Sequence, residues 1–317
     1  MRAASPRWLN ERGSATMSAL IVMVLATMIL AGLIWQQHLA IRQLEYDRDR
    51  SQAEWLHIAA VDTARFVLAL NAKTTTAEDS LTEAWAIPLT DTKVSDFLRG
   101  VDIPQELSQL SMMGQVSDAQ SRFNLNNLVD TDSGRRIDPD GLFVFQALLG
   151  NIGVDRGLAH QVANQLANTG FKFTDAAQLE GFEGFNPNLL QRLRSLVTAL
   201  PERTKINVNT ASSDVLRAVF QGMNAGQAAS FITVRTQTPI KSMADLKTVL
   251  TNLGVSNNES PLVDIKTSYF ITRTEVRYPE SVYVGESIIQ RSAPGSIIVN
   301  RTLTKIISTR FFSTIKE

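Results

Sequence analysis

The chain begins with a short polar stretch followed by a long run of hydrophobic residues. No Asp, Glu, Lys or Arg occurs between Gly13 and Ile41, and residues 14–34 are mostly Ala, Leu, Ile, Val and Met. Helical residues rise about 1.5 Å each, so this run extends roughly 32 Å, enough to cross the hydrocarbon core of a bilayer. The pattern predicts a membrane-spanning helix over residues 14–35.

The charges of the polar stretch predict the orientation of that helix. Arg2, Arg7 and Arg12 stand against one acid, Glu11, and positively charged flanks stay on the cytoplasmic side. We expect a single-pass protein with a cytoplasmic N-terminus and an exported remainder. A cleaved signal peptide fits less well, because the apolar run exceeds the usual signal core and no small-x-small site follows it before Gln36. A plain signal anchor stays an alternative.

Helical spacing continues beyond the predicted span, because residues 36–73 contain neither Gly nor Pro. One stripe with the 3.6-residue period of a helix consists of Trp55, Ala59, Asp62, Phe66 and Ala69, with Ile58 and Leu70 beside it. A stripe of this kind usually faces a core. We expect an amphipathic continuation over residues 36–73 that buries this stripe against a soluble head.

Alternating polar and hydrophobic residues predict a sheet near the end of the chain. Residues 268–315 indicate three antiparallel strands joined by short turns, with Pro279 and Gly285 expected to separate the first strand from the second. Residues 114–126 alternate in part and are expected to be extended as well.

Between these extended regions the pattern is helical. Residues 140–200 and 212–253 are rich in helix formers with apolar spacing near 3.6 residues. Short patterns also occur twice, residues 123–126 matching 206–209 and residues 173–179 matching 240–246. We predict two helical modules of similar design, inserted into an α/β head.

The predicted fold class is therefore α+β, with a long N-terminal helix packed on an antiparallel sheet and a large helical insertion. Its expected parts are a leader (1–13), a transmembrane helix (14–35), an amphipathic continuation (36–73), a head (74–128 and 262–317) and two helical modules (129–203 and 204–261).

Composition excludes several classes of function. Lys plus Arg equals Asp plus Glu at 31 each, so no global field favours nucleic acid or anionic lipid. The chain has no Cys, which excludes thiol catalysis, disulfides and cysteine-type zinc sites. His38, His57 and His160 lie in separate helical contexts, and the sequence has no nucleophile motif or phosphate-binding loop. We expect a protein that is not an enzyme.

The acidic stretch from Asp130 to Asp140 could suggest calcium. An EF-type loop needs an oxygen ligand at its fifth place and Glu at its twelfth, where this stretch has Gly134 and Gly141. A turn is favoured instead, with Asp138 or Asp140 capping the helix that begins near Gly141. No metal ligand is predicted here.

The segment Ile206–Ser212 resembles the opening of the helix-hairpin-helix modules of competence-type DNA receptors. Those modules need a Gly-x-Gly hairpin, because backbone amides must approach a phosphate. Here Asn224 stands at the second Gly, and only Arg217 and Arg235 offer nearby positive charge. We expect no nucleic-acid partner, and a membrane-anchored DNA-binding protein of the DNA-uptake type is the alternative function.

The position of Gly13, between the charged leader and the apolar run, resembles the class III leader of type IV pilins and type II secretion pseudopilins. The resemblance implies that a prepilin peptidase cuts after Gly13 and methylates the new N-terminus, Ser14.

Four features together resemble the type II secretion minor pseudopilin K family: the Gly13 junction, Trp85-x-x-Pro88, residues 117–128 and residues 204–212. The resemblance covers essentially the whole chain and implies a pilin-like fold with an all-helical insertion of two SAM-like or helix-hairpin-helix-like modules. It implies a subunit of the bacterial inner membrane with a periplasmic head. The implied partners are the prepilin peptidase and minor pseudopilins I, J and H, in a hetero-oligomer.

The resemblance also implies a position in the filament. Most pilins carry Glu at the fifth mature residue, which compensates the N-terminal amine of a neighbour within the lipid-buried filament core, where an uncompensated charge is costly. After cleavage at Gly13 the fifth residue is Ser18. A subunit without this acid suits the tip of the pseudopilus, where it would cap the filament and help to initiate it.

Family members often carry an acidic loop associated with calcium in the first helical module. The matching residues 161–171 contain no acid. We therefore expect no calcium and no cofactor.

Overall fold

The computed structural model describes residues 12–74, 77–108, 110–131, 134–255, 259–291 and 304–315. Most of the predicted leader, residues 1–11, lies outside the described residues. The chain divides into two compact units, Met1–Trp55 and Leu56–Glu317.

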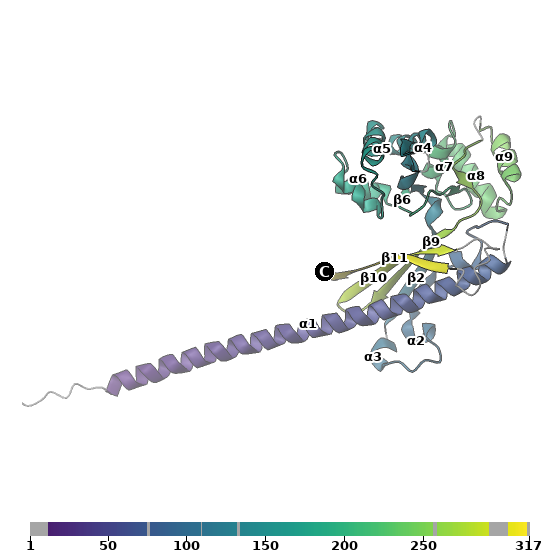
Figure 1. The fold of residues 1–317 in the computed structure, drawn as a ribbon. Helices are drawn as coiled ribbons and strands as arrows, with labels where there is room; N and C mark the ends of the chain where they lie inside the picture. Colours follow the sequence, from purple (N-terminus) through teal and green to yellow (C-terminus); the bar gives the residue numbers. More distant parts are fainter. Residues whose placement is uncertain are drawn as a thin grey trace, which may run out of the picture. The chain divides into compact units, whose positions relative to one another are not determined.

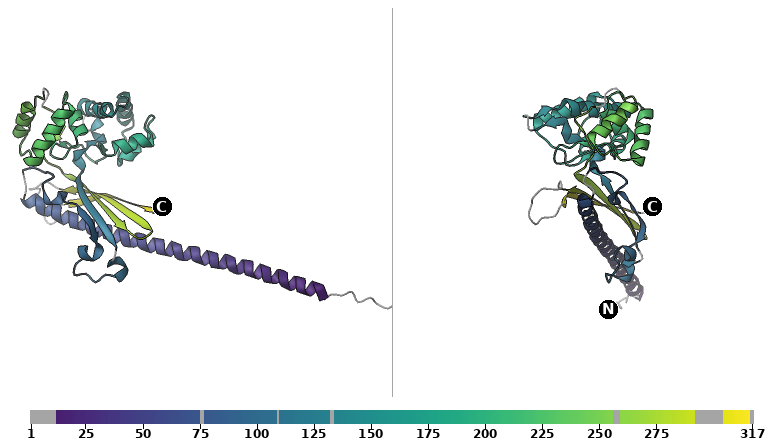
Figure 2. Two further views of the ribbon diagram at one scale, coloured as in Figure 1. Left: turned by 180° about the vertical axis from the view of Figure 1, so that it is seen from behind. Right: turned by 90° about the vertical axis from the view of Figure 1, so that its right-hand side faces the viewer.

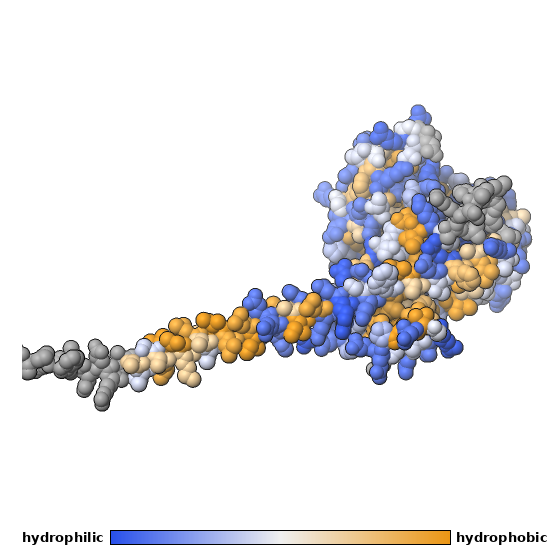
Figure 3. Space-filling view, turned by 60° about the horizontal axis from the view of Figure 1, so that its bottom comes forward, coloured by the Kyte–Doolittle hydropathy of each residue, from blue (hydrophilic) through white to orange (hydrophobic). Residues whose placement is uncertain are grey.

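One long helix, α1 (Arg12–Thr74), accounts for the described part of the first unit and continues into the second (Figure 1). Its most apolar window has a mean hydropathy of 2.6, and among the described residues it is the one helix long and apolar enough to cross a membrane. Large apolar side chains such as Leu20, Ile21 and Met23 are exposed along it. In Figure 3 hydrophobic residues dominate this part of the helix, and polar residues become frequent further along.

In the described part of the second unit, five strands form an antiparallel sheet in the order β1-β2-β9-β10-β11 (Figures 1 and 2). Their bounds are β1 (Leu89–Lys93), β2 (Ser111–Asp118), β9 (Tyr269–Arg277), β10 (Ser281–Arg291) and β11 (Thr304–Ile315). The short helix η1 (Ala84–Ala86) precedes β1 in the chain, and α2 (Val94–Phe97) and α3 (Gln105–Ser108) lie between β1 and β2. The three antiparallel strands predicted over residues 268–315 are confirmed.

Two details of the strand prediction are wrong. The extended segment predicted for residues 114–126 ends at Asp118, because Asp118 and Asn124 each accept a hydrogen bond from the backbone N–H two residues later and turn the chain. It continues as η2 (Ala119–Ser121), β3 (Phe123–Asn124) and η3 (Leu125–Leu128). Gly285 does not separate two strands either, because β10 runs through it without a break.

The helix face that packs on the sheet is the opposite of the one predicted. Leu56, His57, Val61 and Leu68 are buried, together with Ala60, Ala64 and Ala72, and the core beneath them contains Trp85, Phe270 and Ile289. Small residues allow a helix to approach a sheet closely, and large aromatic side chains would hold it away. Both faces of this helix are apolar, so periodicity alone did not select the buried one.

The large side chains of the stripe predicted to be buried are instead exposed, and Ala59 and Ala69 are half-buried. Trp55 is 71% and Phe66 70% exposed, Ile58 46% and Leu70 53%, and Asp62 is exposed and pairs with Arg65. Ile58, Phe66 and Leu70 are called the outer stripe below.

The chain between β2 and β9 forms a helical region (Figure 2), and a short parallel strand pair brackets each of its two modules. In the first, β3 pairs in parallel with β6 (Val197–Thr198); in the second, β7 (Ile206–Asn207) pairs in parallel with β8 (Val263–Asp264). The first module contains β4 (Val129–Asp130), β5 (Arg136–Ile137), α4 (Pro139–Asn151), α5 (Gly157–Thr169), η4 (Ala176–Gly181) and α6 (Pro187–Leu193). The second contains α7 (Ser213–Val219), α8 (Ala225–Gln237) and α9 (Met243–Asn252).

Both modules contribute to one hydrophobic core, which includes Phe145 and Leu148 from the first module and Phe220 and Phe231 from the second. Phe123, which precedes the predicted first module, lies in the same core. The predicted limits, 129–203 and 204–261, stay predictions.

Candidate functional site

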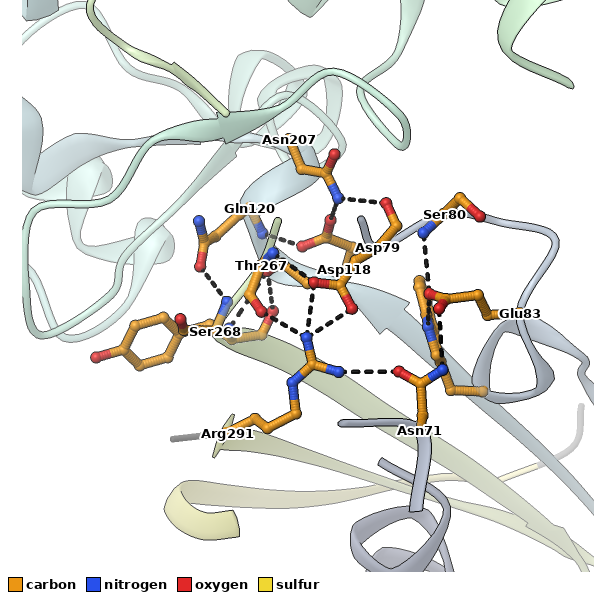
Figure 4. A network of polar contacts seen from close by, with 12 residues as sticks. Asn71, Asp79, Ser80, Glu83, Asp118, Gln120, Asn207, Thr267, Ser268 and Arg291 are labelled. Carbon is orange, nitrogen blue, oxygen red and sulfur yellow. Dashed lines mark hydrogen bonds and ion pairs between the residues drawn. The ribbon is translucent and has the colours of Figure 1, made fainter. Parts of the chain in front are cut away.

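A buried ion pair lies where the helical region meets the sheet (Figure 4). Nη2 of Arg291, the last residue of β10, lies 2.6 Å from both carboxylate oxygens of Asp79, and the two side chains are 8% and 3% exposed. Arg291 also donates to Oδ1 of Asn71 at 3.0 Å and to the carbonyl oxygen of Thr267 at 2.9 Å. Since a buried ion pair is stable only when its remaining polar atoms find partners, these contacts hold the pair in place.

A second buried carboxylate, Asp118, receives several hydrogen bonds at the end of β2. Its Oδ2 accepts from Nδ2 of Asn207 at 2.9 Å and from Oγ1 of Thr210 at 2.6 Å. Its Oδ1 accepts from the backbone N–H of Gln120 at 2.7 Å. Burial raises the pKa of Asp118 to about 6, although these hydrogen bonds oppose the shift.

Asn207 connects Asp118 to the chain at Asp79, because its Nδ2 also donates to the backbone carbonyl of Asp79 at 3.0 Å (Figure 4). The ion pair Arg291–Asp79 and the Asp118–Asn207 contact are called the buried junction below. It joins the chain after α1, the ends of β2 and β10, and the first strand of the second helical module.

The two asparagine-rich motifs, residues 123–126 and 206–209, make equivalent hydrogen bonds. Asn126 accepts from the N–H of Phe173 at 2.9 Å and donates to its carbonyl at 2.8 Å. Asn209 makes the same pair of hydrogen bonds with Ile240, both at 2.9 Å. These partners begin the second pair of matched patterns, so the repeat seen in the sequence corresponds to a repeated contact.

Sequence reasoning did not single out Arg291, Asp79 or Asp118. A signal was present for Arg291, because the alternation of β10 places it on the buried face with Tyr283 and Ile289. A cation at an inward position needs a buried partner. The sequence did not show which acid would provide it, since Asp79 and Arg291 are 212 positions apart.

The contacts of the second module argue against DNA contact. Arg235 is buried and donates to the backbone carbonyls of Val208 and Ala211. Arg217 pairs with Asp214 at 3.4 Å. Asn224, at the place of the second hairpin Gly, caps α8 by accepting from the N–H of Gln227. Neither cation on which the DNA-binding alternative depended is therefore free for a phosphate.

The acidic stretch forms a helix cap, as predicted, because Oδ1 of Asp138 accepts from the N–H of Gly141 at 2.8 Å. Asp138 and Asp130 also pair with Arg203. Within the described ranges no group of three or more His, Asp or Glu side chains is placed to hold a metal ion. The three histidines are not brought together: His57 is buried in the second unit, and His38 and His160 are exposed.

The predicted processing residues lie at the start of α1. Gly13 and Ser14 belong to its described backbone, and the hydroxyl of Ser18 donates to the carbonyl of Ala15 at 3.0 Å. Cleavage after Gly13 and methylation of Ser14 stay predictions.

A long apolar N-terminal helix, an antiparallel sheet and a helical insertion give the chain a pilin-like fold. Family models described as "Type II secretion system (T2SS), protein K" match residues 121–170 and 206–266, one in each helical module. Type II secretion system protein K of Pseudomonas aeruginosa is 30% identical, with 92% of each chain covered. The chain therefore belongs to the type II secretion system protein K family, which confirms the resemblance seen in the sequence.

Two further comparisons agree. Type II secretion system protein K of Pectobacterium carotovorum is 23% identical, over 92% of this chain and 96% of the relative. A chain from the crystal structure of the GspK-GspI-GspJ complex of enterotoxigenic Escherichia coli has the same fold, with a TM-score of 0.58 and 17% identity over 85% of this chain and 99% of that chain. The family is a component of the secretion machinery and not a known enzyme family.

Proposed function

We propose that this chain is the tip subunit of the type II secretion pseudopilus, a structural protein without a cofactor or bound calcium. A single span would hold it in the bacterial inner membrane, with the N-terminus in the cytoplasm and the head in the periplasm. The observation that carries the proposal is the outer stripe of α1. Phe66 alone is 70% exposed in the described structure, and contiguous exposed apolar residues mark interaction surfaces.

The outer stripe would pack against the equivalent helices of other pseudopilins. A chain of the same fold was crystallised with GspI and GspJ. We infer that this chain assembles with minor pseudopilins I and J, and with H, through the side of α1 that carries Ile58, Phe66 and Leu70. The helix would then present one apolar face to its own sheet and the other to its partners.

Two features support a position at the tip. Ser18 provides no carboxylate for the N-terminal amine of a neighbour, so the subunit is poorly suited to a repeated place in the shaft. The helical region adds bulk between β2 and β9, and it would hinder the stacking of a further subunit. A subunit with both features could cap the filament and help to initiate it.

Assembly can be tested by co-expressing the full chain with pseudopilins I and J and measuring their co-purification. Phe66→Glu places a charge in the outer stripe and should reduce recovery of the partners at least tenfold. Phe143→Glu is the matched control, because Phe143 is exposed on α4 and lies outside the stripe. Equal recovery with the two variants would remove the outer stripe as the assembly surface.

The tip position needs a second experiment. Pseudopili assembled with an epitope-tagged chain should bind gold-labelled antibody at one end in electron micrographs. Label distributed along the shaft would exclude a capping role, even if the chain assembles with its partners.

Processing can be tested by the intact mass of the chain from membranes with and without a prepilin peptidase. Loss of residues 1–13 with one added methyl group is expected. If the chain stays unprocessed while the peptidase cleaves a control pilin, the N-terminal segment is not a prepilin leader. The alternative of a plain signal anchor would then be favoured.

A further inference from the structure

A cleft of about 780 Å³ lies between the sheet and the first helical module. Its sheet side includes Ile271 of β9 and Ile288 of β10. Their chain neighbours Phe270 and Ile289 pack in the core beneath α1. Because successive strand residues point to opposite faces, the cleft lies on the face of the sheet turned away from residues 56–74 of α1.

The lining of the cleft is positively charged. Among the described residues its charged side chains are Arg122, Arg194, Arg273, Arg310, Asp175 and Glu286. Four cations against two carboxylates leave a net charge of +2 in a chain whose total charge is zero. A concave surface with one predominant sign of charge concentrates ligands of the opposite sign.

Three of the arginines are already engaged. Oε1 of Glu286 accepts from Nη1 of Arg273 at 2.7 Å and from Nη2 of Arg194 at 3.2 Å. Arg310 pairs with Asp175, and its Nη2 lies 3.9 Å from Oε2 of Glu286. One internal carboxylate thus holds the guanidinium groups together, as an incoming carboxylate could also do.

Arg122 differs from these three. It is half-buried, just before β3, and it has no hydrogen-bond partner within the described residues. Burial lowers the pKa of its guanidinium, and the nearby Glu286 opposes this shift. A partly desolvated guanidinium without an acceptor is unfavourable, and a ligand that provides one recovers that cost.

The uncharged part of the lining is mixed. Its half-buried apolar residues include Leu190 from the helical module and Ile271 and Ile288 from the sheet, and its polar residues include Gln115, Gln191 and Ser308. A site with apolar side chains and a few fixed charged groups suits a ligand with both kinds of group, and the volume lies within the roughly 300–1,000 Å³ typical of ligand sites. A free inorganic anion would use only the charges.

We propose that this cleft binds an acidic peptide segment of a partner protein, with one carboxylate on Arg122 and apolar side chains against Leu190, Ile271 and Ile288. The partner would approach the sheet face opposite to the outer stripe, so the cleft stays open when α1 packs against other pseudopilins. The proposal does not depend on the position of the subunit in the filament.

The test uses the full chain in detergent micelles and two fluorescein-labelled ten-residue peptides. Both contain alternating leucines; one has Asp and Glu between them and the other Asn and Gln. Fluorescence anisotropy should show at least tenfold tighter binding of the acidic peptide, with an affinity that weakens as salt is raised. Equal binding of the two peptides would overturn the proposal. Displacement by inorganic phosphate at lower concentration than by unlabelled acidic peptide would also overturn it, since the site would then recognise a simple anion.

Three variants locate the binding. Arg122→Gln should weaken the binding of the acidic peptide about tenfold or more, since a charge-assisted hydrogen bond is lost. Arg99→Gln, which removes the same charge at an exposed position outside the cleft, should bind like the unmodified chain. Glu286→Gln should bind more tightly, because the internal competitor is gone, and a misfolded variant could not produce that gain. Equal affinity of Arg122→Gln and Arg99→Gln, or weaker binding by Glu286→Gln, would contradict the assignment.

Discussion

The imidazole ring of His57 lies directly against the α-carbon of Gly285, where a Cβ would meet the ring at 2.5 Å. Nδ1 of His57 hydrogen-bonds with the hydroxyl of Thr274 at 2.6 Å, and Nε2 with the hydroxyl of Ser287 at 2.8 Å. A glycine in the middle of β10 thus makes room for a histidine of α1, and this contact fixes how closely helix and sheet approach.

Gly285→Ala should therefore destabilise the head. The added methyl group cannot fit without moving α1 from the sheet, and overpacking of this kind costs about 1–3 kcal/mol. The measurement is the free energy of unfolding in urea. Gly181→Ala is the control, because nothing lies within 4 Å of a Cβ there. Equal stability of the two variants would show that α1 can move away from the sheet without a measurable loss of stability.

The stability of the head should depend on the protonation of His57. Burial lowers the pKa of His57 below its usual 6.5, so the folded state favours the neutral ring. Its contribution is fully present above pH 6.5, the unfolded value, and is lost as the pH falls towards the folded pKa.

The check compares the free energy of unfolding of the unmodified chain and of His57→Phe between pH 8 and 5. The advantage of the histidine protein should shrink as the pH falls. Asp118, with its pKa raised to about 6, contributes with the opposite sign between its usual 3.8 and 6, but it is present in both proteins and cancels in the difference. A difference that is constant with pH would contradict the prediction.

Asp79→Asn should be strongly destabilising. It removes the charge that compensates buried Arg291, and breaking one side of a buried ion pair costs about 3–5 kcal/mol. Glu259→Gln breaks the solvent-exposed pair with Lys247 and should leave the midpoint of thermal unfolding essentially unchanged. Similar midpoints for the two variants would contradict the prediction, since they would mean that water compensates the unpaired charge of Arg291.

Asn209→Ala should cost about 1–3 kcal/mol, because the backbone N–H and carbonyl of Ile240 lose their partner. Asn126→Ala should cost a similar amount through Phe173, since it makes the same two contacts. Asn164→Ala, at an exposed position of α5, serves as the control in the same urea titration. A large effect at only one of the two motifs would show that the modules are not equivalent in energy.

Ser18→Glu should change how the subunit enters the pseudopilus. A carboxylate at the fifth mature position could pair with the N-terminal amine of a neighbour, so the variant should appear within the shaft or alter filament length. Ser18→Ala supplies no charge and should behave as the unmodified chain. Tip labelling and secretion identical in the two variants would show that the missing acid does not determine the position.

Local patterns were sufficient for the elements whose environment is uniform. The apolar run predicted the long helix, and alternation predicted β9, because a strand with one buried face repeats every two residues. Turn residues predicted that two more strands follow, although not the bounds of β10. The duplicated motifs predicted two modules, and their asparagines proved to make equivalent backbone contacts. The leader and the two motifs also carried the family resemblance.

The same patterns did not identify the buried face of α1, because either face could have packed on the sheet. Along residues 56–72 of α1 both faces carry apolar residues, and Phe66 and Leu70 give the exposed face large apolar side chains. The structure buries the face with Ala60 and Ala64 because small side chains fit against the sheet. Phe66 and Leu70 on the other side stay exposed in the described structure.

The sequence by itself determined the long apolar helix, the strands, the repeat and the family, since each depends on neighbouring residues or on motifs read along the chain. The tertiary structure alone decided the Arg291–Asp79 pair, the contact of His57 with Gly285, and the gathering of Arg122 and Glu286 in one cleft. These residues are far apart in sequence, and burial energy and charge pairing act on distances in space that only the completed fold defines.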